Sequence, residues 1–183
     1  MKIRRIALLS CMLACAALAG AQGYPKGSAY VDGSVHWESR ELCPDATNWD
    51  VVAGYDFLIW NSFDLYAGPR VGWYTETDCT AARDWGVHNE PSVGGQLYFL
   101  YPSPFTKSLV LTCGIASDVM FNFDATENGA PVRVDLFGEV FLGIRLYLGE
   151  RCHIETRFDA GQFAFFDSPP TFIKLGLLAG YDF

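Results

Sequence analysis

Apolar and polar residues alternate along much of the chain, and the clearest case is the segment 132–148. One set of alternate positions there is aliphatic except for Gly138, whereas the other set carries four charged residues, among them Glu139 and Arg145. Successive side chains of a β-strand point to opposite faces, so a period of two residues gives a strand one apolar and one polar face. The segment 132–148 is therefore predicted to be a two-faced strand.

Seven further segments repeat this alternation. They are residues 29–37, 49–58, 63–74, 92–101, 109–123, 152–162 and 171–183. Each is about as long as a tilted strand that crosses a bilayer, which needs roughly 9–11 residues. Pro69 lies inside one of these segments and has no N–H to donate to a neighbouring strand, so we expect a bulge or a local defect there.

The connections between these segments alternate between long and short. The long ones are residues 38–48, 75–91, 124–131 and 163–170, and the short ones are 59–62, 102–108 and 149–151. Bacterial membrane barrels have short turns at one end and long loops at the other. The alternation of loop length therefore favours a barrel that crosses a membrane.

Aromatic residues on the apolar faces gather toward both ends of the predicted strands. The long-loop end has Trp37, Trp49, Trp73, Phe121 and Phe123, and the short-turn end has Tyr55, Phe57, Phe63, Phe99, Tyr101, Tyr181 and Phe183. Two aromatic belts around an aliphatic middle match the two interfaces of a bilayer. We predict an all-β, eight-stranded, antiparallel up-and-down transmembrane β-barrel. A soluble lipocalin-like barrel is the alternative, and it would need the apolar face inside.

The first residues have the pattern of an export signal. Lys2, Arg4 and Arg5 precede an apolar run, 6–18, that is too short to span a bilayer as a helix. The small residues Ala19-Gly20-Ala21 follow, so cleavage is expected after Ala21, or alternatively after Ala19. We predict a signal peptide at 1–21 and a barrel domain at 22–183. Because the residues before Cys15 loosely resemble a lipobox, lipidation of Cys15 stays open.

The composition excludes two classes of protein. Of 183 residues, 15% are aromatic, which is too rich for a disordered chain. The net charge is −8, with 13 Lys and Arg against 21 Asp and Glu. A nucleic-acid-binding protein needs clustered basic residues to neutralise phosphates, so we expect no nucleic-acid partner.

These patterns resemble the small eight-stranded outer-membrane proteins of diderm bacteria: the OmpA transmembrane domain, OmpX and OmpW. The chain's last stretch is similar to the family's assembly signal at Leu177, Ala179, Tyr181 and Phe183, although Asp182 departs from the basic residue of OmpW. The resemblance implies an outer-membrane location, outer-membrane lipid as the surroundings, and the barrel-assembly machinery as a partner during biogenesis.

The polar faces would place ten acidic and five basic residues inside the barrel. Buried charges must be paired or solvated, so an ion-pair network is expected in the lumen. Its predicted members are Asp64, Arg70, Glu139, Arg145, Glu155, Arg157, Asp159 and Lys174. Such a network could fill the lumen or line a selective pathway, and the acidic excess leaves room for water or a cation.

Cysteine and histidine positions limit the chemistry. Cys43 and Cys79 lie in two long loops on the same side and could form a disulfide, whereas Cys113 and Cys152 lie too far apart to pair. No metal site and no cofactor are expected. Ser34, His36 and Asp32 share one strand face, but neighbours on that face are about 7 Å apart, so no catalytic residues and no enzyme activity are predicted.

Three functions remain open. The first, implied by the resemblance to OmpW, is a narrow channel or a lateral route for small apolar molecules, with Leu42 and Trp85 as candidates for an apolar funnel. The second is a structural or adhesive surface protein of the OmpX type with a filled lumen. The third, a lipid-modifying enzyme, lacks a nucleophile constellation. The solute, the surface partner and the oligomeric state are left open by the sequence.

The long loops are acidic. They carry only Arg40 and Arg83 as basic residues, which argues against binding of heparin or of lipid A phosphates through a basic patch. The acidic residues assigned to these loops are Glu38, Glu41, Asp45, Glu76, Asp78, Asp84, Glu90, Asp124, Glu127 and Asp167.

Overall fold

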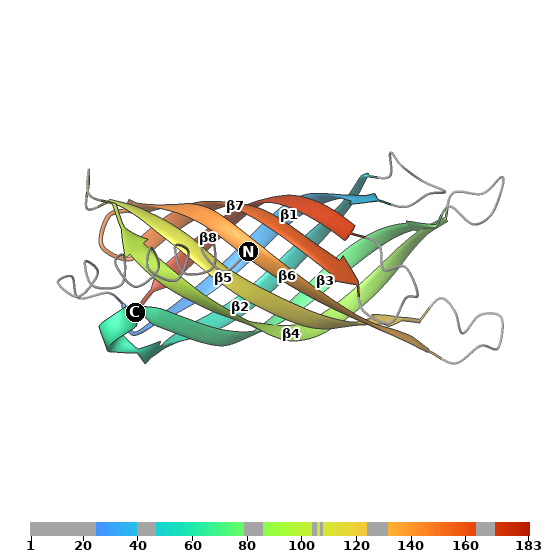
Figure 1. Ribbon diagram of the computed structural model, residues 1–183, viewed down its shortest axis with the longest axis horizontal. Coiled ribbons are helices and arrows are strands. Elements are labelled where there is room, and N and C mark those ends of the chain that lie inside the picture. Colours follow the sequence, from blue (N-terminus) through green and yellow to red (C-terminus); the bar gives the residue numbers. More distant parts are fainter. Residues whose placement is uncertain are drawn as a thin grey trace, which may run out of the picture.

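The computed structural model is a closed barrel of eight strands in chain order, each antiparallel to its neighbours, with β1 paired to β8 (Figure 1). It describes residues 25–39, 47–78, 86–103, 106, 108–123, 132–163 and 171–183. The strands are β1 (Gly27–Ser39), β2 (Thr47–Trp60), β3 (Leu65–Asp78), β4 (Gly86–Pro102), β5 (Leu109–Asn122), β6 (Arg133–Leu148), β7 (Cys152–Phe163) and β8 (Thr171–Asp182). The predicted fold is confirmed.

Several predicted features lie outside the described residues. They are the signal peptide 1–21, Cys15, Leu42, Cys43, Cys79 and Trp85. Within the described ranges, no helix is long and apolar enough to cross a membrane. The short 3-10 helix η1 (Asn61–Phe63) lies between β2 and β3.

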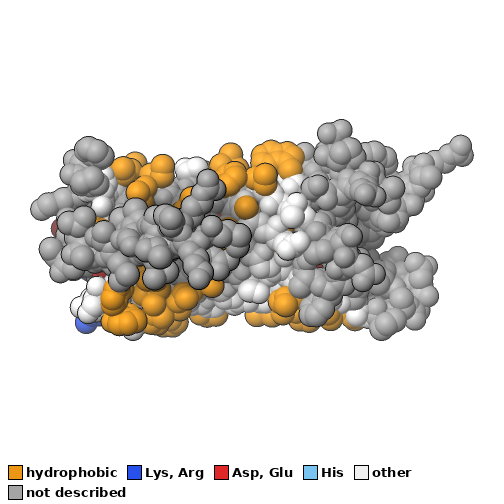
Figure 2. Space-filling model, in the orientation of Figure 1, with side chains coloured by type: hydrophobic (Ala, Val, Ile, Leu, Met, Phe, Trp, Pro, Cys, Tyr) orange, Lys and Arg blue, Asp and Glu red, His pale blue; other side chains and the backbone are white. Residues whose placement is uncertain are grey.

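The alternation in the sequence becomes an alternation of exposure in the barrel. Along β8, the apolar residues Ile173, Leu175 and Leu177 are exposed on the outside, whereas Phe172 and Lys174 are buried inside. The other strands follow the same rule, so apolar side chains cover the barrel wall (Figure 2). An apolar wall and a charged interior are the reverse of a lipocalin-like barrel. The faces therefore belong to a transmembrane barrel.

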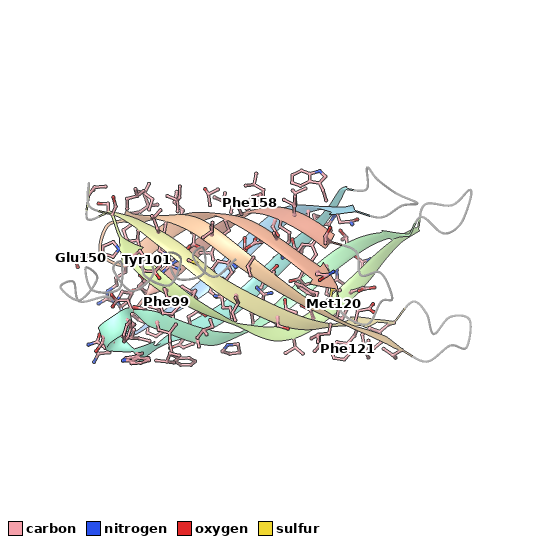
Figure 3. All side chains as sticks on the ribbon, viewed as in Figure 1. Phe99, Tyr101, Met120, Phe121, Glu150 and Phe158 are labelled. Carbon is pink, nitrogen blue, oxygen red and sulfur yellow. The ribbon has the colours of Figure 1, made fainter. Side chains whose placement is uncertain are left out.

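The aromatic belts are present at the two ends of the wall. Phe99 and Tyr101 lie toward the short-turn end, near Glu150, and Phe121 lies toward the opposite end (Figure 3). Trp37, Trp49 and Trp73 are exposed at the long-loop end.

The predicted strand boundaries beside the loop 75–91 and at Phe63 are wrong. The segment 75–91 was expected to be a loop, but β3 continues to Asp78 and β4 begins at Gly86, with pairs from Thr75–Asn89 to Asp78–Gly86. Backbone pairing needs no apolar face, so a hairpin can continue into water where the alternation has ended. At the other end, Phe63 lies in η1 rather than in a strand.

The β2–β3 ladder is locally broken beside Pro69, as expected. Pairs are present at Gly54–Arg70 and at Phe57–Ala67 in the same register, but not in between. The register shift itself lies at Leu58 and Trp60. The defect predicted from the missing N–H of proline is therefore a gap in the ladder, and the bulge lies nearer the turn.

Candidate functional site: the charged lumen

The inward positions of the strands bring an acidic excess into the lumen. Among the described residues, eleven carboxylates and four Lys or Arg side chains are buried. The acidic ones are Asp32, Asp50, Asp56, Asp64, Glu90, Asp118, Asp135, Glu139, Glu155, Asp159 and Asp182, and the basic ones are Arg70, Arg145, Arg157 and Lys174. Glu90 was expected in a loop but points inward from β4, because β4 extends past the predicted loop boundary.

The first network crosses the lumen in its loop-side half. Arg70 on β3 donates from Nε to Asp118 Oδ1 on β5 at 2.7 Å and lies 2.7 Å from Glu139 Oε1 on β6 through Nη1. Tyr74 donates its hydroxyl to the other oxygen of Asp118 at 2.8 Å. One guanidinium thus joins three strands, and its planar fork suits two carboxylates at once.

Lys174 on β8 continues this network to the other side of the barrel. Its ammonium lies 2.8 Å from Glu139 Oε2 and 3.0 Å from Asp50 Oδ2 on β2. Ser34 on β1 donates its hydroxyl to Asp50. A continuous chain of polar contacts therefore runs from β5 through β3, β6, β8 and β2 to β1.

The second network lies in the turn-side half. Arg145 on β6 donates from Nε to Glu155 Oε2 on β7 at 2.8 Å, and Thr112 on β5 donates to the other oxygen at 2.7 Å. Arg145 also reaches the Tyr98 hydroxyl on β4 at 3.5 Å. Arg145 and Glu155, which lie on the neighbouring strands β6 and β7, are thus held together with the hydroxyl of Tyr98 from β4.

Arg157 on β7 carries the second network across the lumen. It donates to Gln96 Oε1 on β4 at 3.2 Å and to Asp159 at 3.4 Å. The Gln96 amide in turn donates to both oxygens of Asp56 on β2, at 3.0 and 3.1 Å. The guanidinium also lies 3.6 Å from the centre of the Phe141 ring, a close cation–π contact.

Aromatic rings fill the space that the polar networks leave. Tyr66 and Tyr98 stack at 5.4 Å in the turn-side half. In the loop-side half, the Lys174 ammonium lies 5.2–5.7 Å from the rings of Tyr74, Phe137 and Phe172. The inward cavity that these three rings line has a volume of about 10 Å³, which is about the space for one water molecule.

The structure brings seven of the eight predicted network residues into these contacts, and Asp64 lies apart. Asp64 follows η1 with a left-handed backbone (φ 46°) at the short-turn end. Within the described part of the chain its Oδ2 has no hydrogen-bond partner, although its side chain is buried. Burial raises the pKa of Asp64 to about 6. Asp64 is therefore not a member of the two networks, because the turn after η1 places it at the short-turn end of the barrel, apart from them.

Four important partners of the network were not predicted. Asp50, Gln96, Tyr98 and Asp118 complete it from strands that are not sequence neighbours of the cations they meet. Their inward direction follows from the alternation, but the partner across a barrel depends on the stagger of the strands, which the alternation does not give.

The hydroxyl of Ser34 and the imidazole of His36 both lie beside Asp50. Ser34 donates to Asp50 rather than to His36, and His36 Nδ1 lies 3.9 Å from the same carboxylate. A serine nucleophile needs a base that accepts its proton, and here the Ser34 hydroxyl donates its hydrogen bond to a carboxylate that is shared with Lys174. Cys113 and Cys152 are free thiols on the outer face.

The four residues of the predicted assembly signal form an outward row along β8 and the residue that follows it. Leu177, Ala179, Tyr181 and Phe183 alternate with inward residues. Phe183 packs its ring 5.0 Å from that of Tyr55 across β1. A Cβ at Gly27 would lie 2.8 Å from the Phe183 ring, so glycine makes room for it.

With this geometry established, known proteins can be compared. No family model and no curated protein matches the chain. Among solved structures it is similar to Neisserial surface protein A, with a TM-score of 0.66, 10% identity and coverage of 88% of this chain and 100% of that one. It is also similar to Ail, the attachment invasion locus protein of Yersinia pestis, with a TM-score of 0.50 and 13% identity over 88% of this chain and 100% of that one.

A second structure of Ail, in complex with the heparin analogue sucrose octasulfate, matches with a TM-score of 0.55 and 11% identity, again over 88% of this chain and 100% of that one. These neighbours are small outer-membrane barrels with eight strands. The fold and the charged lumen thus define a small transmembrane β-barrel of the outer-membrane type. At these identities, the likeness concerns the fold alone.

Proposed function

We propose that this chain is a surface protein of the outer membrane whose barrel is a closed anchor and whose loop side makes its contacts. The observation that carries the proposal is the chain of contacts Asp118–Arg70–Glu139–Lys174–Asp50, which crosses the lumen. An eight-stranded barrel has an interior just wide enough for its side chains. Ion pairs that join opposite walls leave little room for a solute.

The β3–β4 hairpin supports a role at the surface. It continues five residues beyond Trp73 in the aromatic belt, to Asp78. At about 3.4 Å per residue, this is about 17 Å along the strand. A paired hairpin beyond the belt offers a firm platform for contacts outside the membrane.

The names of two structural neighbours support the same role, since one is a surface protein and the other an attachment protein. One of them has been solved with a sulfated heparin analogue. The loops of the present chain are acidic by sequence. We therefore expect its surface partner to be neutral or cationic and not a sulfated glycan.

Export by a cleaved signal peptide and insertion by the barrel-assembly machinery belong to this proposal. The outward row from Leu177 to Phe183 on β8 is consistent with recognition by that machinery.

Conductance in a planar bilayer tests the closed lumen. The mature protein is refolded, its folding is verified by heat-modifiable gel mobility, and its insertion is verified by protection from protease. We expect no reproducible conductance steps. Steps that change in size with Glu139→Gln, but not with the exposed-turn control Glu150→Gln, would overturn the closed anchor and establish a passage through the lumen.

The alternative is a narrow cation pathway, and the excess of eleven buried carboxylates over four cations among the described residues favours it. The same recording distinguishes the two, because an acidic pathway would select cations over anions. A lateral route for apolar molecules is tested separately, by uptake of an apolar fluorophore into vesicles that contain the folded barrel.

A further inference from the structure

An exposed arginine lies at the short-turn end of the barrel wall. Arg151, in the β6–β7 turn, donates from Nη1 to the Tyr181 hydroxyl at 3.0 Å, and its carbonyl accepts the backbone N–H of Asp182 at 2.7 Å. Among the Lys and Arg side chains that the structure describes, Lys26 and Arg151 are exposed and the other four are buried in the lumen. The guanidinium of Arg151 is therefore a positive charge that is held in place at the level of the aromatic belt.

A low row of side chains follows β7 up the wall from Arg151. It consists of the outward residues Cys152, Ile154 and Thr156, and we call it the β7 track. At Cys152 and Thr156, the paired residues on β6 and β8 are larger. These larger neighbours are Leu148, Tyr181, Ile144 and Leu177. The β7 track is thus lower than the strands on both sides of it.

The β7 track leads into a hollow on the outer face of the barrel. The hollow has a volume of about 490 Å³, and outward side chains from five neighbouring strands line it. They include Leu111, Cys113, Leu142, Ile144, Thr156 and Phe158. Phe158 lies on the wall between the two ends of the barrel, whereas Glu150 marks the short-turn end (Figure 3). An apolar hollow on a lipid-facing wall can hold the end of a hydrocarbon chain.

The spacing between Arg151 and the hollow matches the dimensions of a phospholipid. Thr156 is five residues from Arg151, which is about 17 Å along the strand. A strand tilted by about 45° rises about 12 Å over that length. The hydrocarbon core is about 30 Å thick, so the chains of one leaflet occupy about 15 Å. An acyl chain whose phosphate lies beside Arg151 can therefore reach the hollow.

We propose that Arg151, the β7 track and the hollow form a binding site for one anionic phospholipid of the leaflet at the short-turn end. Its phosphate pairs with the guanidinium of Arg151, and one acyl chain lies along the β7 track with its end in the hollow. A net negative headgroup suits an exposed cation better than a zwitterionic one, which carries its own ammonium. The site lies on the outer wall, so it does not depend on whether the lumen is closed.

Lipid binding to the refolded barrel in detergent micelles tests the charged half of the site. Native mass spectrometry counts the bound palmitoyl-oleoyl phosphatidylglycerol or phosphatidylcholine. We expect phosphatidylglycerol to bind about fivefold more tightly, and Arg151→Gln to remove most of that difference. Lys26→Gln is the matched control, because it removes the same charge at the same end but before β1, where its carbonyl bonds to β2. It should leave the preference unchanged.

Filling the β7 track tests the acyl-chain half. Thr156→Trp should weaken binding of phosphatidylglycerol several-fold, whereas Val71→Trp, on the exposed wall of β3, should not. If Thr156→Trp does not fold, the native thiol of Cys113 in the hollow gives the second measurement. Phosphatidylglycerol should slow its alkylation by N-ethylmaleimide, and glycerol phosphate, which has no chains, should not.

Three results would overturn the phospholipid site. The first is equal binding of the two lipids by the unaltered barrel. The second is an equal loss in Arg151→Gln and Lys26→Gln, which would mean that only the general charge of this end matters. The third is unchanged binding in a folded Thr156→Trp barrel or, where that variant does not fold, alkylation of Cys113 at the same rate with and without the lipid.

Discussion

Glu139 holds two cations at once, because Arg70 from β3 and Lys174 from β8 each bind one of its carboxylate oxygens. Glu139→Gln keeps the shape but leaves both cations without their shared counter-charge in a buried site. Leaving a buried charge without any partner costs about 3–5 kcal/mol. Arg70 keeps Asp118 and Lys174 keeps Asp50 in this variant, so the cost should be about 1–3 kcal/mol. We expect a loss of that size in the free energy of unfolding, measured by urea titration of the barrel refolded into vesicles. Glu150→Gln, in the exposed β6–β7 turn, should change it by less than about 0.5 kcal/mol.

Asp64 is a buried carboxylate outside the strands, and its pKa of about 6 gives its substitution a pH dependence. Because the pKa in the folded barrel is above that of an unfolded Asp, the ionised form destabilises the fold. That penalty is absent below about pH 4 and is complete above about pH 6. Asp64→Asn should therefore stabilise the barrel at pH 8 by about 1 kcal/mol, allowing for screening at the turn, and should have no effect at pH 4. Asn also tolerates the left-handed backbone. A benefit of equal size at both pH values would contradict the raised pKa.

At the scale of elements, the joint between β2 and β3 depends on Gly68. A Cβ there would collide with Tyr55 O and would lie 2.7 Å from the Asp56 Cα, both of which belong to the β2 backbone. Gly68→Ala should cost about 1–3 kcal/mol of stability, since two strands must move apart. Gly138 on β6 faces outward with open space around its Cβ position, so Gly138→Ala is the matched control and should be close to neutral. Chemical denaturation of both variants under one lipid condition decides the comparison.

The row on β8 that ends at Phe183 predicts a defect in assembly. Phe183→Ala removes the ring that packs on Tyr55 across the β1–β8 closure, together with the terminal residue of the expected assembly signal. We expect several-fold less folded barrel in the outer membrane of expressing cells, measured by heat-modifiable mobility of membrane fractions. Phe158→Ala is the control, because Phe158 is equally exposed on the barrel wall (50% against 48%) but lies mid-strand. An equal loss in both variants would show that lipid-facing area alone is responsible.

The sequence predicted the faces of the strands well and the contacts across the lumen less well, for a physical reason. Which way Leu142 or Arg145 points depends only on the period of two residues. Which carboxylate Lys174 meets depends on the stagger of eight strands, so Asp50 was missed as its partner. Asp64 was placed in the network because its parity is inward, but η1 turns the chain before β3 begins. The extension of β3 and β4 was missed because polar hairpins carry no apolar alternation.

For the whole molecule, the decisive property is that the barrel has its apolar surface outside, and Leu142 on β6 tests it. Leu142 is 61% exposed on the barrel wall. In a water-soluble protein, an exposed substitution changes stability by less than about 0.5 kcal/mol. In a bilayer, an arginine near the midplane on the lipid face costs about 2–4 kcal/mol. We therefore expect Leu142→Arg to lower the free energy of unfolding from vesicles by about 2–4 kcal/mol, whereas Glu150→Arg at the turn should leave it nearly unchanged. If Leu142→Arg were neutral in vesicles, the wall around β6 would face water, and the assignment of this barrel to a membrane would fail.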